Sequence, residues 1–175
     1  MKTILHPTDF STSSEDVFRM ICPIARDRSA EIIVLHSVCP ANCPPDDRDG
    51  DQVNRDSPLY QSIWERFARL RQLADDIPMM LCVKVGNPVE TIVKVAGHEC
   101  CDLIALAAPY HAYPHQQYHG SIPDCLKKFA PCPVLCLTES PYQAESKRII
   151  EGLKSSLDEC ADSQVVATAV GDRNW

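Results

Sequence analysis

The residues best suited to chemistry lie within positions 102–137, where an apolar run, a loop of mixed polarity and a short helical pattern follow one another. Gly120 and Ser121 stand directly before that helical pattern. We expect Ser121 to cap the helix, with Asp124 at its third position reaching back. Because the free amides of a helix N-terminus attract anions, this junction predicts a site for a phosphate group.

A second candidate residue, Asp9, follows the first apolar run of the chain, Thr3–His6. Thr12 and Glu15 stand three residues apart and predict a capping box at the start of the first helix. Asp9 therefore sits between a strand and a helix, where an acidic side chain serves either as a turn residue or as a contact to a ligand.

Three histidines, His111, His115 and His119, recur at intervals of four within the loop. On a helix they would share one face and could chelate a transition metal. Pro109 and Pro114 disfavour a helix there. The alternatives are a solvated polar loop, a metal site, and contacts between protonated imidazoles and an anionic ligand.

The elements that would position these residues alternate between apolar runs and helical patterns. We expect strands at residues 3–6, 31–36, 78–85, 102–107 and 134–137, with helices that begin at Thr12, Ser57, Asn87 and Ser121 between them. Strands separated by helices predict right-handed crossovers and a parallel sheet covered on both faces. In such sheets ligands bind at the carboxyl ends of the strands, where the winding reverses.

Four further segments carry a family resemblance: Pro7-Thr8-Asp9-Phe10-Ser11, Leu35-His36-Ser37-Val38, Gly86-Asn87-Pro88 and Ala130-Pro131-Cys132-Pro133-Val134-Leu135. Together with Gly120-Ser121 they make the chain resemble the universal stress protein family over residues 1 to about 138. The resemblance implies an α/β fold: a doubly wound five-stranded parallel sheet of strand order 3-2-1-4-5. This is the Rossmann-like nucleotide-binding architecture shared with the adenine nucleotide alpha hydrolases.

The resemblance also implies a domain organisation, in which residues 1–138 form the stress protein domain. Within it, the proline-rich and acidic composition of residues 39–57 predicts a mobile insertion that lacks fixed structure. Residues 139–175 would form a C-terminal extension, in which a narrow apolar stripe predicts an amphipathic helix before an end of uncertain structure.

The family's phosphate loop, Gly-x-x-Gly-x9-Gly-Ser/Thr, falls on Ala107, Tyr110 and Gly120-Ser121, so two glycines are replaced. Pro109 also removes an amide donor, and Tyr110 puts a ring where the family leaves room for phosphate oxygens. We therefore expect a degenerate ATP-binding loop beside an adenosine pocket that stays open, although the ring of Tyr110 could instead swing out or stack on a base. The nucleotide-binding candidates that the resemblance implies are Pro7, Thr8, Asp9, Val38, Gly86, Leu106, Gly120, Ser121 and Ile122.

The function expected from these features is a non-enzymatic stress-response module with weak binding of an adenine nucleotide or nucleoside. Family members commonly pair through the fifth strand, so the apolar edge formed by Val134, Leu135, Cys136 and Leu137 predicts a homodimer. One alternative is an ATP-binding molecular switch, with or without hydrolysis, and a second is a metal-binding protein that uses the histidine loop. No nucleophile elbow, complete Walker loop or His-Glu-x-x-His motif is present, so no catalytic residue is predicted.

Composition narrows the class of partner and the compartment. The formal net charge is −7, from 24 acidic and 17 basic residues, and the bases are scattered, which disfavours nucleic acid. No apolar run of about 18 residues predicts a membrane span, and residues 1–7 do not form a signal peptide, so we expect a cytoplasmic protein. The ten cysteines should then remain reduced, mostly as buried thiols at positions 22, 82, 100, 101, 125 and 136.

Overall fold

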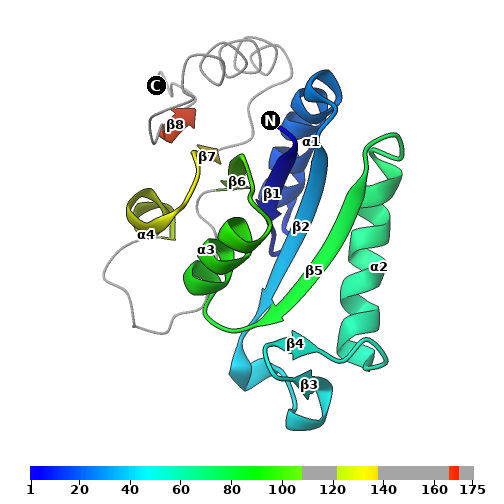
Figure 1. Ribbon diagram of the computed structural model, residues 1–175. Coiled ribbons are helices and arrows are strands. Elements are labelled where there is room, and N and C mark those ends of the chain that lie inside the picture. Colours follow the sequence, from blue (N-terminus) through cyan, green and yellow to red (C-terminus); the bar gives the residue numbers. More distant parts are fainter. Residues whose placement is uncertain (108–121, 138–165, 170–175) are drawn as a thin grey trace, which may run out of the picture.

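The computed structural model describes residues 1–107, 122–137 and 166–169, which form one sheet with helices on both faces (Figure 1). Parallel strands at its centre run in the order β5-β2-β1-β6-β7. This is the predicted order 3-2-1-4-5, because β5, β6 and β7 are the third, fourth and fifth parallel strands along the chain. The strands are β1 (Thr3–Pro7), β2 (Glu31–Val38), β5 (Met79–Val85), β6 (Leu103–Ala107) and β7 (Val134–Leu137).

The sheet is larger than the five strands expected from the sequence, since eight strands lie within the described residues. A short antiparallel hairpin of β3 (Arg48–Asp49) and β4 (Gln52–Val53) joins β5, and β8 (Val166–Ala169) pairs in parallel with β7. The expectation failed because two-residue strands leave no periodic pattern, and because a strand edge attracts a partner from any available segment.

The segment 39–57 has regular structure, which corrects the expectation that it lacks any; its mobility stays a prediction. Two 3-10 helices, Pro40–Asn42 and Pro45–Asp47, lead into the hairpin. Cys43 and Val53 are buried in one apolar cluster, and the guanidinium of Arg48 donates to the carbonyl of Cys43. Two apolar anchors and one cation bound to backbone oxygens hold this otherwise polar segment against the sheet.

Two helices cover each face of the sheet, as a doubly wound fold requires (Figure 1). On one face lie α1 (Thr12–Arg28) and α2 (Pro58–Gln72), and on the other lie α3 (Pro88–His98) and α4 (Ile122–Phe129). Five apolar residues at helical spacing form the inward stripe of α1, and all of them are buried: Val17, Met20, Ile21, Ile24 and Ala25.

The first helix begins one residue earlier than the predicted capping box. Ser11 is the N-cap, and its hydroxyl accepts a hydrogen bond from the amide of Ser14 (3.3 Å). Thr12 is consequently the first helical residue and is exposed. Ser57 and Asn87 cap α2 and α3 as predicted, by accepting hydrogen bonds from amides of the first turn.

Asp102 fixes the start of β6 against β1. Its Oδ2 accepts hydrogen bonds from the amides of Lys2 (2.6 Å) and Thr3 (3.0 Å). Burial acts to raise the pKa of this carboxyl, but the two amide donors and the nearby positive charges leave the pKa below its ordinary value. The two central strands are therefore held in register at the end opposite the carboxyl edge.

Most of the cysteines expected to be buried are buried, and the exceptions are Cys82 and Cys100. Cys100 is exposed in a left-handed conformation (φ 49°), just after α3 ends, while Cys82 on β5 is half-buried. Burial raises the pKa of the Cys101 thiol to about 12 and that of Cys132 to about 11. These thiols are protonated at neutral pH and act as small apolar side chains. No helix in the described part of the chain has the length and apolar character needed to cross a membrane.

Candidate functional site

The carboxyl ends of β1 and β6 lie side by side where the order of the strands reverses. Ile4 pairs with Leu103 and Leu5 with Ile104, so the chain leaves both strands at the same edge. Most of the predicted nucleotide-binding residues that the structure describes stand at or beside strand ends along this edge: Pro7, Thr8, Asp9, Val38, Gly86 and Leu106. Ile122, also predicted, is the first residue of α4 and is half-buried.

The predicted phosphate end of the site falls outside the described residues. This holds for Pro109, Tyr110, Gly120 and Ser121, and for the histidines at 111, 115 and 119. Ala107 is described, and it packs in the apolar cluster on the α1 face of the sheet. Its methyl group therefore packs in the core beneath α1. At that position it does not obstruct a phosphate group.

In the loop after β1, the amide, the carbonyl and the hydroxyl of Thr8 all take part in hydrogen bonds. The Thr8 amide donates to the carbonyl of Leu35 (2.9 Å), and His36 Nδ1 donates to the carbonyl of Thr8 (2.8 Å). Thr8 Oγ1 accepts from the amide of Phe10 (2.9 Å), and Phe10 adopts a left-handed conformation (φ 58°). The loop thus presents a fixed backbone at the carboxyl edge, which limits the entropy lost when a ligand binds.

A buried polar chain supports this loop from beneath. Ser14 Oγ donates to Thr8 Oγ1 (2.7 Å) and lies 3.4 Å from His6 Nε2, while His6 Nδ1 donates to the carbonyl of Ala105 (2.9 Å). The sequence analysis did not single out His6 or Ser14. The sequence did contain a sign of this role, because His6 stands inside an apolar strand. A buried imidazole at such a position needs partners on both of its nitrogens.

His6 is neutral at physiological pH because complete burial lowers its pKa from 6.5 to about 4. Burial also lowers the pKa of His36. A serine beside a neutral histidine is the arrangement of a nucleophile and its base. Here both side chains have no exposed surface, so a substrate cannot reach them, and the pair serves to position Thr8.

Asp9 has the turn role that was one of its two predicted interpretations. Its Oδ1 accepts a hydrogen bond from the amide of Ser11 (2.9 Å). Its other carboxylate oxygen has no hydrogen bond to a described residue. A carboxyl oxygen at the carboxyl edge can accept a hydrogen bond from a sugar hydroxyl, so the turn role and a ligand role are compatible.

Gly86 ties the end of β5 to the end of β2. Its amide donates to the carbonyl of Val38 (3.0 Å). A Cβ added at this glycine would lie 3.1 Å from Thr91 Oγ1, a contact that would force the neighbouring side chain to move. The structure therefore gives Gly86 a packing role just before α3.

Ser37 is a residue of this edge that the sequence analysis did not select. The last pair of β1 and β2 is Pro7 with Leu35, so Ser37 extends two residues past the end of β1. Strand alternation places it on the α3 face, like Leu35. Its Oγ is buried and has no hydrogen-bond partner among the described residues, which leaves a polar group there without compensation for its burial.

The sequence model of the Universal stress protein family matches residues 1–138 of this chain. The chain belongs to the universal stress protein family. No curated protein matches the sequence. The stress protein fold found here therefore rests on the family match and on similarity to solved structures.

Several solved structures of stress proteins are similar to this one. A universal stress protein in complex with cAMP has a TM-score of 0.57 and 20% identity, covering 78% of this chain and 96% of that chain. The universal stress protein from Archaeoglobus fulgidus in complex with dAMP has a TM-score of 0.55 and 18% identity, covering 78% and 96%. A family protein from Arabidopsis thaliana with AMP bound has a TM-score of 0.52 and 16% identity, covering 83% and 99%. At these identities the similarity establishes the fold.

The outer edge of β7, which was predicted to pair with a second copy, is not free. Along β7, Val134 pairs with Val166 and Leu137 pairs with Ala169, so β8 of the same chain occupies the outer side of the strand. All four residues of β7 are buried. The apolar edge does need covering, as the sequence indicated, but the covering strand belongs to this chain. This corrects the assignment of residues 134–137 as an open dimer edge.

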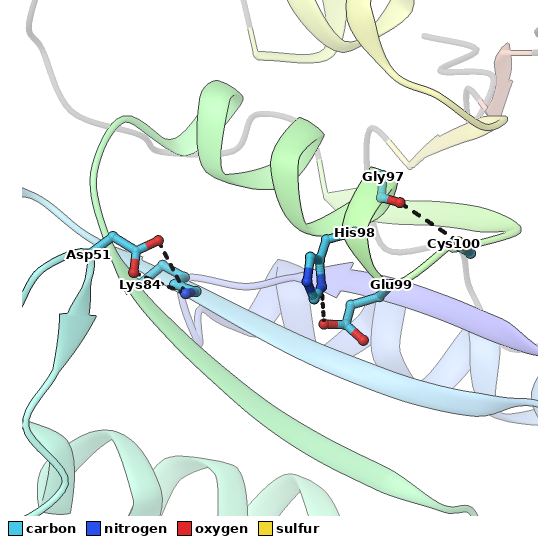
Figure 2. A network of polar contacts seen from close by, with 6 residues as sticks. All are labelled: Asp51, Lys84, Gly97, His98, Glu99 and Cys100. Carbon is cyan, nitrogen blue, oxygen red and sulfur yellow. Dashed lines mark hydrogen bonds and ion pairs between the residues drawn. The ribbon is translucent and has the colours of Figure 1, made fainter.

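A groove of about 770 Å³ lies at the opposite edge of the sheet, along β5. Figure 2 shows two polar contacts that border it. At the end of β5, Lys84 Nζ lies 3.1 Å from each carboxylate oxygen of Asp51, and at the end of α3, His98 Nδ1 lies 2.9 Å from Glu99 Oε1. Opposite charges balance along its lining, so the groove has no strong preference for an anion or a cation. Within the described residues no cluster of three histidine, cysteine or acidic side chains could hold a metal ion.

Proposed function

We propose that this universal stress protein is a non-catalytic cytoplasmic module that binds an adenine nucleoside or nucleoside monophosphate at the carboxyl ends of β1, β2 and β6. One observation carries the proposal. Hydrogen bonds from Ser14, to Leu35 and from His36 hold Thr8 and its loop at the point where the sheet reverses.

Two further findings support an adenine ligand. Solved stress proteins of the same fold were crystallised with cAMP, dAMP or AMP, each an adenine nucleotide with a single phosphate. The uncompensated hydroxyl of Ser37 lies on the strand that extends past β1, so a polar ligand at this edge would offer it a partner.

A small adenine ligand suits this chain better than a triphosphate. The family's phosphate loop has lost two glycines here, at Ala107 and Tyr110, and Pro109 removes a backbone donor. Fewer backbone donors remain to hold three phosphates, while the adenosine end keeps Pro7, Thr8 and Asp9.

The test is thermal unfolding of the full chain with adenosine, AMP or ATP with magnesium, each over a range of concentrations. We expect adenosine or AMP to raise the stability by about 2.7 kcal/mol at 100 times its Kd, and ATP to add no more than AMP does. In the variant Tyr110→Gly, ATP should stabilise more than AMP. A strong preference of the wild-type chain for ATP would overturn the proposal.

Ser37→Ala tests the adenosine end separately. Removing a buried hydroxyl that has no partner should leave the unliganded chain as stable as before, or more stable. The shift produced by AMP should become smaller. Ser62→Ala removes a surface hydroxyl of α2 and should change neither quantity. Equal AMP shifts in all three proteins would show that the ligand lies away from β2.

A further inference from the structure

The outer edge of β5 carries backbone groups that point away from the sheet. The amide of Ile32 on β2 donates to the carbonyl of Pro78 (2.9 Å), the residue directly before β5. The even-numbered residues of β5 therefore direct their backbone groups toward β2. Because these directions alternate along a strand, Met79 and Leu81 direct both their amide and their carbonyl outward.

The hairpin confirms this alternation and covers only one end of the edge. The amide of Val85, another odd-numbered residue, donates outward to the carbonyl of Asp51 (2.7 Å). The strand β4 pairs with β5 at a single position, Gln52 with Lys84, and the chain then turns into the cap of α2. Among the described residues, no strand pairs with Met79–Cys82 on this side.

The open part of the edge is uncharged and partly exposed. Residues 78–82 are Pro-Met-Met-Leu-Cys, and the side chain of Met80 is 46% exposed. The groove described above follows this edge and includes Met80 and Cys82 in its lining, so there is room beside the strand for the side chains of a partner. An uncharged strand edge of this kind is a template for pairing with another strand.

We propose that β5 is the homodimer surface of this protein, and that its partner is β5 of a second copy running antiparallel. A twofold axis through Met80 places Met79, whose backbone groups point outward, opposite Leu81 of the second copy. By symmetry Leu81 then lies opposite Met79 of the second copy. Each pair then exchanges both of its backbone hydrogen bonds, while the two Met80 side chains lie directly opposite each other at a non-hydrogen-bonded position.

Two features of the chain favour a second copy over an unrelated strand. The segment is self-complementary in this register, since no charged residue faces a like charge and apolar side chains meet across the axis. At the opposite end of the sheet β8 covers β7, the strand predicted to pair with a second copy, whereas the edge of β5 at Met79–Cys82 is uncovered by any described strand. The hairpin also limits the pairing to the segment around Met80, which fixes the register.

The experiment measures the oligomeric state of the full chain by sedimentation and light scattering over a range of concentrations. We expect a dimer for the wild type and an increase of about tenfold or more in the dimer dissociation constant for Met80→Lys, because two lysines would then face each other. Phe129→Lys, a change of another exposed apolar side chain on α4, should leave the dimer intact. Circular dichroism and thermal unfolding establish that both variants fold.

A second variant tests the register. In Met80→Cys, mild oxidation should join the two introduced thiols in a covalent dimer, with the linkage identified by mass spectrometry of the joined peptides. The wild type, treated in the same way, controls for exposed Cys100. A wild-type monomer at every concentration, or a dimer that Met80→Lys leaves unchanged, would overturn the inference. Binding of AMP is measured separately, so a monomer that binds AMP would count against the surface and not against the proposed function.

Discussion

The burial of His6 predicts that acid destabilises this protein well above the pH at which carboxylates titrate. In the folded chain the imidazole is neutral, with a pKa of about 4, because it is completely buried between α1 and the sheet. In the unfolded chain its pKa returns to about 6.5. The unfolded state therefore binds one more proton than the folded state between these two values, and the free energy of unfolding falls as the pH falls through this window.

The size of the effect follows from the width of the window. Well inside this window each pH unit removes about 1.4 kcal/mol, and lowering the pH from 7.5 to 4.5 removes about 2.5 kcal/mol in total. The contribution of His6 is fully present above pH 6.5. His36, whose pKa is lowered by burial as well, adds a loss of the same sign.

The assay is urea unfolding at pH 7.5, 6.5, 5.5 and 4.5, with His6→Asn beside the wild type. Asparagine keeps an N–H group that can donate to the carbonyl of Ala105 but takes up no proton in this range. The variant should be less stable at pH 7.5 by about 1–3 kcal/mol, through lost packing, and should lose less stability on acidification. His98→Asn removes an exposed histidine and should follow the wild-type curve. Parallel curves for the wild type and His6→Asn between pH 6.5 and 4.5 would refute the reasoning.

Two further predictions concern the elements that position the site. Ser11→Ala should lower the free energy of unfolding by about 1 kcal/mol, because it removes the cap of α1. Thr12→Ala should change it by less than about 0.5 kcal/mol. If urea unfolding gave the opposite ranking, Thr12 would be the cap. Asp102→Ala should lower it by about 1 kcal/mol at pH 7, since the amides of Lys2 and Thr3 lose their acceptor, and Asp102→Asn, which keeps one oxygen, should lose less. Equal losses for the two Asp102 variants would assign the effect to charge.

The parallel strands and the helices between them could be predicted from the sequence because each depends on a local pattern, whereas their order 3-2-1-4-5 was implied by the family resemblance. Apolar runs such as 31–36 and 102–107 bury both faces of a strand, and the intervening stripes at helical spacing bury one face of a helix. The caps Ser57 and Asn87 were predicted for the same reason, since a cap depends only on its own first turn.

The candidate site could be predicted only in part. The strand-end residues Pro7, Thr8 and Asp9 follow from the position of β1, so their place at the carboxyl edge was predictable. The support that Ser14 and His6 give to Thr8 was not, because it joins α1 to the sheet, and neither was the uncompensated hydroxyl of Ser37. These are properties of contacts between elements, and no spacing along the chain specifies them.

The sequence by itself determined the alternation of strands and helices, and with it the fold class and the strand ends at which a ligand would bind, because each depends on periodicity and on the connection from one element to the next. The strand order was implied by the family resemblance. The tertiary structure alone decided which strand edges remain unpaired. The strand β8 reaches β7 from a distant part of the chain, and β4 stops after one pair with β5. Pairing between distant segments depends on where their backbone donors and acceptors meet in space, and that is settled only when the whole sheet has assembled.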